Sequence, residues 1–115
     1  MILIIGPLAG GKRTFVKQTW GYRAYTTRLG ERAPVFYGAE ALAAGEESID
    51  QLAEQLTRYP VVILNETGGG IVPLSPEVRR ARERAGRLAC RLAGRAETVV
   101  RVWYSLPQVL KGALP

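Results

Sequence analysis

The sequence contains no histidine and a single cysteine, and both shortages restrict its chemistry. Without an imidazole, no histidine can act as a base, a nucleophile or a metal ligand. The lone Cys90 excludes an internal disulfide and is typical of a reducing, cytoplasmic setting. We expect Cys90 to be a half-buried thiol on a helix; a nucleophile or metal ligand there is the alternative.

Long hydrophobic runs are also missing. No apolar stretch approaches the about 20 residues of a membrane-spanning helix, and Met1–Ile5 is too short for a signal peptide. Acidic residues are fewer than basic ones, 10 against 16, which gives a net charge of +6. This surplus favours anionic partners such as nucleotides, phosphorylated substrates or nucleic acid. A length of 115 residues with 47% hydrophobic residues indicates one globular domain, covering residues 1–115.

The first part of the chain has the pattern of a phosphate-binding loop. An apolar run, Ile2–Ile5, is a predicted strand, and Gly6 then begins the motif G-x-x-x-x-G-K, which ends at Lys12. Glycines let backbone N–H groups turn toward a polyphosphate, and the predicted helix Lys12–Trp20 directs its positive dipole end there. A glycine-rich turn with a chance lysine is the alternative. The predicted nucleotide-binding residues are Gly6, Pro7, Leu8, Ala9, Gly10, Gly11, Lys12, Arg13 and Thr14.

The motif departs from its usual form at the last position. A serine or threonine there ligates the nucleotide's magnesium, whereas this chain has Arg13. Thr14 follows one residue later, about 100° further round the helix. Thr14 is therefore the remaining hydroxyl candidate for Mg²⁺.

The rest of the chain alternates predicted strands and helices, which indicates an α/β fold with a mostly parallel sheet flanked by helices. Ser48 and Gln51 form a capping box at the start of one helix, and Ser75 and Pro76 begin the longest one. A tail follows the last strand. The expected strands after the first are Ala24–Thr27, Val35–Tyr37, the central Val61–Leu64 and Thr98–Tyr104, and the tail is Leu106–Pro115.

Glu66 follows the central strand directly. An acid at such a strand end is the usual partner of a phosphate loop, because its carboxylate orients magnesium. We predict this role for Glu66; a carboxylate that only caps or pairs within a loop is the alternative.

The longest helix carries an arginine stripe beside its buried face. Its predicted buried positions are Ala81, Ala85, Leu88, Leu92 and Ala96. The arginines at the same period are Arg80, Arg84, Arg87, Arg91 and Arg95. Such a stripe is compatible with nucleic-acid binding, but a solvated face or a subunit contact is favoured, because Glu77 and Glu83 dilute its charge.

Several segments resemble one enzyme family, the adenosylcobinamide kinase / adenosylcobinamide-phosphate guanylyltransferases. Residues 61–73, VVILNETGGGIVP, are similar to its Asn-Glu-Val-Gly-x-Gly-Ile-Val-Pro signature. Residues 79–83 (RRARE), 85–88 (AGRL) and 105–112 also resemble its later motifs, and residues 1–12 match its first strand and phosphate loop. The resemblance covers residues 1–17 and 61–112.

The resemblance implies a RecA-like P-loop domain in the cytoplasm, a step in cobalamin assembly and a homo-oligomer. Family members phosphorylate adenosylcobinamide with ATP or GTP and Mg²⁺, and then transfer GMP through a histidine. By position, Lys12 and Glu66 are the expected catalytic residues, and Glu66 and Thr14 the expected metal ligands. The expected substrate-binding residues are Asn65, Thr67, Gly68, Gly70 and Pro73.

Three departures from the family pattern limit these expectations. The guanylyl-accepting histidine is absent, so the transferase activity should be lost. The chain between residues 18 and 60 is shorter than in the family, and a strand–helix portion with an acid-bearing strand end is missing from the match. Arg13 replaces the metal-ligating hydroxyl, and Ala89-Cys90 stands where the family has Asn-Gln.

Two functions follow from these observations. The first is an ATP- or GTP-dependent kinase that acts on a corrinoid, adenosylcobinamide. The second is a non-catalytic nucleotide- or corrinoid-binding protein derived from that family.

Overall fold

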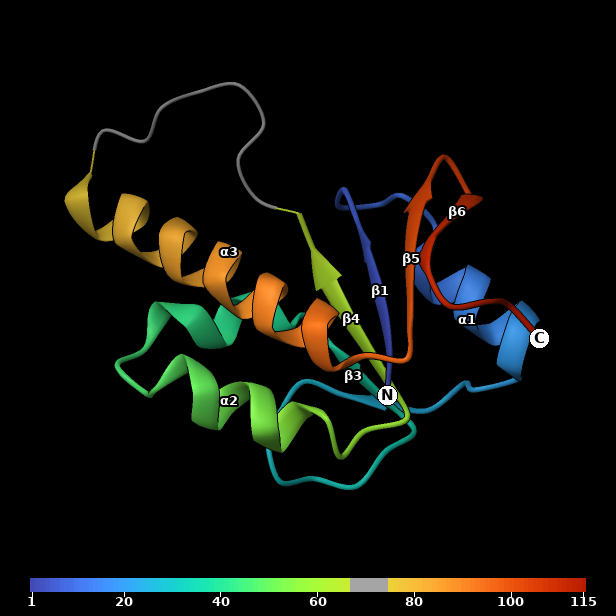
Figure 1. Cartoon of the computed structure of the whole chain (residues 1–115), viewed down its shortest axis with the longest axis horizontal. Helices are drawn as coiled ribbons and strands as arrows, with labels where there is room; N and C mark the ends of the chain where they lie inside the picture. Colours follow the sequence, from blue (N-terminus) through green and yellow to red (C-terminus); the bar gives the residue numbers. More distant parts are fainter. Residues whose placement is uncertain (67–74) are drawn as a thin grey trace.

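A computed structural model describes residues 1–66 and 75–115, and its six strands form one mixed sheet (Figure 1). The strand order is β2-β3-β4-β1-β5-β6; β6 pairs antiparallel with β5, and all other pairs are parallel. The strands are β1 (Ile2–Gly6), β2 (Tyr25–Thr26), β3 (Val35–Tyr37), β4 (Val61–Asn65), β5 (Thr98–Trp103) and β6 (Leu106–Lys111). The helices are α1 (Lys12–Trp20), the 3-10 helix η1 (Ala39–Ala44), α2 (Ile49–Leu56) and α3 (Pro76–Arg95).

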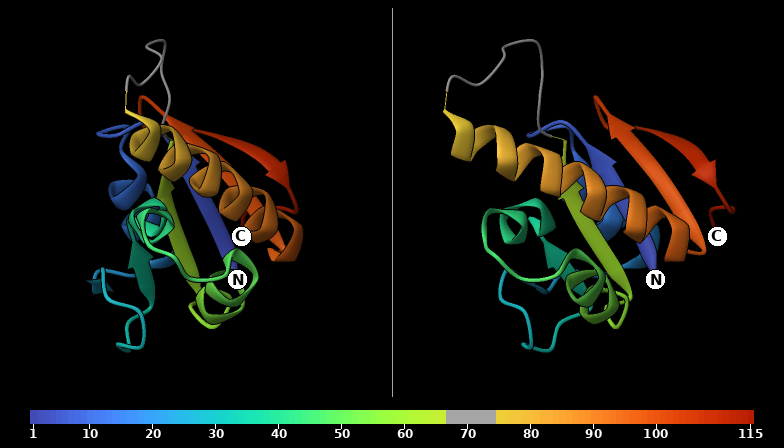
Figure 2. Two further views of the ribbon diagram at one scale, coloured as in Figure 1. Left: turned by 90° about the vertical axis from the view of Figure 1, so that its left-hand side faces the viewer. Right: turned by 60° about the vertical axis from the view of Figure 1, so that its left-hand side comes forward.

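Helices cover both faces of the sheet, so the fold has three layers (Figure 2). On one face, Leu3 and Val62 pack with the buried side chains of α2 and α3. On the other, Ile4 and Ile63 pack with Phe15 and Val16 of α1. Successive residues of β1 and β4 therefore point to opposite buried faces, which explains why both strands are continuous apolar runs.

The predicted α/β class and mostly parallel sheet are confirmed. Strand β4 is central and buried along its whole length, and α1 has the predicted bounds and ends at Gly21 in a left-handed conformation. The Ser48 hydroxyl accepts a hydrogen bond from the Gln51 amide at the start of α2, as the capping pattern predicts. The predicted strand Ala24–Thr27 is shorter, only Tyr25–Thr26.

The predicted tail at Leu106–Pro115 is wrong, because most of it forms β6. A two-residue turn, Tyr104 and Ser105, joins β5 to β6, and both residues have positive φ, 51° and 61°. Positive φ at both central positions is the geometry of the tight hairpin turns that glycine and asparagine usually occupy. Pro107 is tolerated because β6 is an edge strand.

Helix α3 packs through Ala85, Leu88 and Leu92. Ala81 is only half-buried, and Cys90 is exposed rather than half-buried, because it lies outside this stripe. Ser75 occupies the N-cap position, but its side chain makes no capping hydrogen bond. In residues 1–66 and 75–115, no helix has the length and apolar character needed to span a membrane.

Candidate functional site

The loop between β1 and α1, residues 6–12, is built around close backbone approaches. We call it the glycine loop. A Cβ on Gly6 would collide with the Val102 carbonyl of β5, and a Cβ on Gly11 would collide with Ser105 of the hairpin turn. The Ser105 amide also donates a 2.9 Å hydrogen bond to the Gly10 carbonyl. The β5–β6 hairpin therefore supports the glycine loop from one side, and both lie at the same end of the sheet (Figure 1).

The first turn of α1 offers its amide groups without a side-chain cap. Its N-cap residue is Gly11, with φ 88°, and the turn contains no acidic residue. In the part of the chain that the structure describes, no hydrogen bond engages the amides of Lys12, Arg13 or Thr14, and the first α1 bond runs from Phe15 to Gly11. An uncapped helix start of this kind favours an anion through its N–H groups and its dipole.

Lys12 is buried, with 3% of its surface exposed, although it carries a charge. Its ammonium turns back over the glycine loop and donates to the Pro7 carbonyl. Burial lowers the pKa of Lys12 below its ordinary value of 10.5, while the nearby carboxylates Glu40 and Glu66 act in the opposite direction. A buried cation whose hydrogen bond goes to a neutral carbonyl is suited to an incoming anion.

Glu66 lies beside the glycine loop, as its position after β4 predicts. Strands β1 and β4 pair with Gly6 opposite Asn65, and the Glu66 amide donates a 2.8 Å hydrogen bond to the Gly6 carbonyl. Its carboxylate accepts two hydrogen bonds from Arg101 of β5, at 2.8 and 2.9 Å. This fork raises the pKa of Arg101. Glu66 is thus paired with a protein cation at about one-third exposure of both side chains, 34% and 30%.

A second acid at this site, Glu40, was not predicted from the sequence. Glu40 lies in η1, and its carboxylate accepts hydrogen bonds from the Asn65 backbone amide (2.8 Å) and side-chain amide (3.2 Å). It follows β3, the strand beside β4, so an acid does follow a neighbouring strand in the shortened interval 18–60. The sequence feature that could have identified Glu40 is its position three residues after the apolar strand β3.

Asn65, a predicted substrate-binding residue, has one unused polar atom. The residue is 7% exposed, and within the described residues its side-chain oxygen Oδ1 has no hydrogen-bond partner. An orphaned buried acceptor is costly unless a ligand, an ion or water satisfies it. Its place at the carboxyl end of β4 is where α/β sheets bind ligands.

Arg13 and Thr14 border a hollow of about 290 Å³ at the glycine loop, together with Tyr37. The Arg13 guanidinium lies over the Tyr25 ring, 4.0 Å from its centroid, and 5.8 Å from that of Tyr37. The two rings meet edge to face. Thr14 is exposed. Leu8 is also exposed, and Ala9 has positive φ, 59°.

The remaining predicted residues of the site lie outside the described residues. They are Thr67, Gly68, Gly70 and Pro73.

Oxygen donors at this end of the sheet fit Mg²⁺ held chiefly by nucleotide phosphates. Mg²⁺ commonly takes one or two carboxylates and leaves its other positions to phosphate and water. Glu66 and Glu40 are the two carboxylates near Lys12, and Asn65 adds the orphaned oxygen. In residues 1–66 and 75–115, no cluster of three or more metal-binding side chains occurs.

The arginine stripe of α3 has a structural use. Arg80 forms a bidentate pair with Glu46 at 2.7 Å, which lowers the pKa of Glu46, and Arg91 donates to Asp50 at 2.8 Å. Arg84 donates to the carbonyls of Ala43 and Glu47. Three of the five stripe arginines therefore fasten α3 to η1 and to the start of α2.

Compared with known proteins, the chain matches no family model and no curated protein sequence.

Proposed function

We propose that the protein binds the polyphosphate of ATP or GTP at the glycine loop and acts as a kinase of adenosylcobinamide in the cytoplasm. The observation that carries the nucleotide site is the buried Lys12 ammonium beside an uncapped helix start. The corrinoid acceptor rests on the resemblance of residues 61–73 and 79–112 to the cobinamide kinases. This role is consistent with a loss of guanylyl transfer, because the chain has no histidine.

In this role the chain acts mainly by positioning and charge. The Lys12 ammonium leaves the Pro7 carbonyl and pairs with the β- and γ-phosphates, while the amides at the start of α1 donate to their oxygens. Arg13 stands at the rim of the loop hollow, where its charge stabilises the transferring phosphoryl group. The arginines Arg80, Arg84 and Arg91 do not take this part, since they are bound to η1 and α2.

Mg²⁺ would supply charge neutralisation of the phosphates when bound. Glu66 and Asn65 are the residues that would hold it, with Glu40 keeping Asn65 in place through the two hydrogen bonds. Separation of the Glu66 carboxylate from Arg101 would make both of its oxygens fully available to the metal.

A second function is favoured by that same ion pair. If Arg101 keeps Glu66 occupied, the glycine loop binds nucleotide without a metal, and the protein is a non-catalytic nucleotide- or corrinoid-binding subunit. Arg13 at the metal-ligating position agrees with this alternative.

A phosphoryl-transfer assay separates the two functions. The purified protein is incubated with adenosylcobinamide, Mg²⁺ and radiolabelled ATP or GTP, and labelled product is measured. Transfer that disappears in Glu66→Gln supports the kinase. Nucleotide binding without any transfer to adenosylcobinamide contradicts it and leaves the binding subunit.

We also propose that the protein is a homo-oligomer. Large side chains of the β5–β6 hairpin are exposed, among them Trp103, Tyr104, Leu106 and Leu110. Exposed apolar groups on an edge strand are suited to a subunit contact. Light scattering after gel filtration tests this proposal, and a strictly monomeric, active preparation would contradict it.

A further inference from the structure

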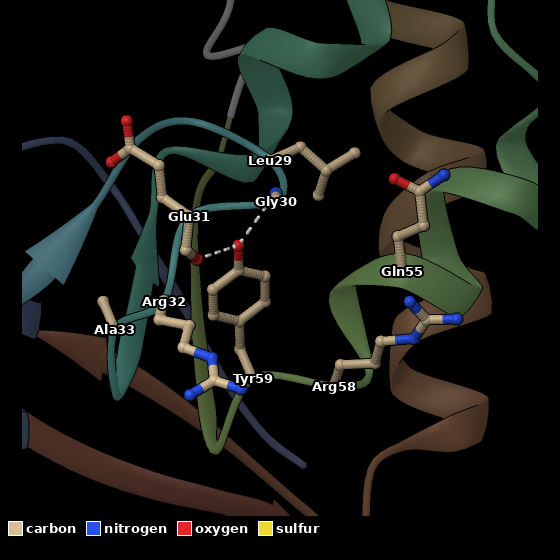
Figure 3. Close-up of a pocket in the computed structure, with 8 residues that line it drawn as sticks. All are labelled: Leu29, Gly30, Glu31, Arg32, Ala33, Gln55, Arg58 and Tyr59. Atoms are coloured by element: carbon tan, nitrogen blue, oxygen red, sulfur yellow. Dashed lines mark hydrogen bonds between the residues drawn. The ribbon is translucent and has the colours of Figure 1, made fainter.

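A second hollow, of about 480 Å³, lies at the other end of the sheet. It is formed by the loop that precedes β3 and by the end of α2 with the residues that precede β4. Because β1, β3 and β4 are parallel, these segments lie at the amino end of the sheet, whereas the glycine loop lies at the carboxyl end. We call it the distal pocket, lined by Leu29, Gly30, Glu31, Arg32, Ala33, Gln55, Arg58 and Tyr59 (Figure 3).

Tyr59 fixes the shape of the distal pocket. Its ring is buried against Phe36, with an edge-to-face contact at 5.2 Å between centroids. Its hydroxyl donates to the Glu31 carbonyl at 2.7 Å and accepts from the Gly30 amide at 3.2 Å. The loop wall is therefore tied to a core residue that is 29 positions away from Gly30. This long-range tie holds the pocket open before any ligand arrives.

The pocket has positive charge from two separate segments. Arg32 comes from the loop wall and Arg58 from the wall after α2, and Figure 3 shows them on either side of the Tyr59 ring. Within residues 1–66 and 75–115, neither guanidinium has a hydrogen-bond or ion-pair partner. By contrast, the arginines of α3 that face η1 and α2 are bonded.

The acid Glu31, which also lines the pocket, does not offset this charge. The Glu31 carboxylate accepts a 2.8 Å hydrogen bond from the Thr26 hydroxyl and lies 3.9 Å from the Arg28 guanidinium. In Figure 3 it points away from Gln55 and Arg58. The polar groups that remain to contact a ligand in the pocket are the guanidiniums of Arg32 and Arg58 and the Gln55 amide, beside the Tyr59 ring.

We propose that the distal pocket binds a small molecule that carries a phosphate monoester. A monoester carries nearly two negative charges at neutral pH, which matches the two guanidiniums, and arginine donors suit phosphate oxygens. The Gln55 amide adds a neutral donor, and Leu29 with Tyr59 offers apolar surface to the organic part. The hollow falls within the range of about 300–1,000 Å³ that small-molecule sites occupy.

A titration with phenyl phosphate, followed by ¹⁵N–¹H NMR, tests the proposal site by site. Saturable shifts of the Gly30 and Arg58 amides are expected, and the Gly10 and Gly11 amides report separately on the glycine loop. Phenyl sulfate, a monoanion of similar shape, should shift the same amides at least about threefold more weakly. Equal affinity for both probes, or no shift at Gly30 and Arg58, would overturn the proposal.

Variants identify the residues responsible. The double variant Arg32→Gln/Arg58→Gln should weaken phenyl phosphate binding at the distal pocket by about tenfold or more, since each guanidinium contributes a charge-assisted contact. Arg87→Gln, which changes an exposed arginine of α3, is the matched control and should leave the affinity within about twofold. Tyr59→Phe keeps the ring and both arginines but removes the two ties to the loop. Weaker binding is expected there too, and unchanged binding in the double variant would contradict the assignment.

Discussion

The two ends of the sheet present positive charge in different ways. At the carboxyl end, a single ammonium, Lys12, is 3% exposed and bends onto a carbonyl of its own loop. At the amino end, Arg32 and Arg58 are exposed and lie free of protein partners within the described residues. Acids lie near both sites and have protein partners at each: at the first, Glu66 is bonded to Arg101 and Glu40 to Asn65, and at the second, Glu31 is bonded to Thr26.

The difference in burial between Lys12 and the two arginines predicts how strongly each end of the sheet should bind an anion. A buried cation interacts through a low dielectric, and the backbone amides around it are fixed in place, so its ligand gains much from contact. Exposed guanidiniums are screened by water and salt and bind more weakly. We therefore expect tight, salt-resistant nucleotide binding at the glycine loop and weaker, salt-sensitive binding at the distal pocket.

The largest predicted effect is that of Lys12→Ala. Loss of the buried ammonium should reduce ATP and GTP affinity at least about 100-fold, because charged hydrogen bonds to the phosphates are lost. Calorimetry measures the affinity, and circular dichroism checks that the variant folds. Lys17→Ala, on the exposed side of α1, is the matched control. If Lys12→Ala bound nucleotide as tightly as the original protein, the buried ammonium would not be the source of tight anion binding at the carboxyl end.

Gly11→Ala should lower the free energy of unfolding by about 2 kcal/mol, because a side chain at positive φ is strained and would meet Ser105. Gly86→Ala is the matched control with the opposite sign: nothing lies near a Cβ there, and alanine should stabilise α3 by about 1 kcal/mol. Urea unfolding measures both. Equal effects of the two substitutions would show that the hairpin does not constrain the glycine loop.

Arg101→Gln tests whether Glu66 can hold Mg²⁺ at the carboxyl end of the sheet. With the fork removed, the Glu66 carboxylate is free, and the gain in ATP affinity on adding Mg²⁺ should increase by on the order of tenfold, the value of one charge-assisted contact. Arg91→Gln, which removes an ion pair remote from the loop, should leave the Mg²⁺ effect unchanged. An unaltered Mg²⁺ effect in Arg101→Gln would mean that Glu66 does not hold the metal.

The smallest predicted effect concerns pH. Burial lowers the pKa of Lys12 below 10.5, so between that lowered pKa and 10.5 the unfolded chain binds more protons than the folded chain. The contribution of Lys12 to stability therefore rises with pH in this window, whereas nucleotide affinity falls as the ammonium is lost. Unfolding and binding measured from about pH 8 upward should show these opposite slopes, and Lys12→Met should lose the stability slope. Parallel slopes would contradict a lowered pKa.

The parts of the fold predicted best were those with strong local signals. Strand β1, the glycine loop and α1 follow from an apolar run, a spaced glycine motif and a terminating glycine. The β5–β6 hairpin was not predicted, because its turn residues, Tyr104 and Ser105, are not the glycine or asparagine that mark such turns. Ser105 is bonded through its amide to the Gly10 carbonyl, a contact between distant segments that no local pattern reveals.

Side-chain partners were predicted least well. Glu66 followed from its place after β4, but its pairing with Arg101 depends on β5, which is distant in sequence. Glu40 was missed because it does not follow the short strand β3 directly but lies in η1, three residues after Tyr37. The distal pocket was missed because it combines segments that only the folded chain brings together. The stripe of α3 was expected to be a solvated face or a subunit contact, whereas Arg80, Arg84 and Arg91 are bonded to η1, α2 and the segment between them within the chain.

Calorimetric titration of the purified protein with ATP and GTP, at fixed salt and with or without Mg²⁺, tests the central claim most directly. We predict saturable binding of one nucleotide per chain, lost in Lys12→Ala and retained in Arg32→Gln/Arg58→Gln. Stronger binding with Mg²⁺ would support the kinase, and equal binding would support the non-catalytic subunit. Absence of binding to both nucleotides in every condition would contradict a nucleotide site at the glycine loop.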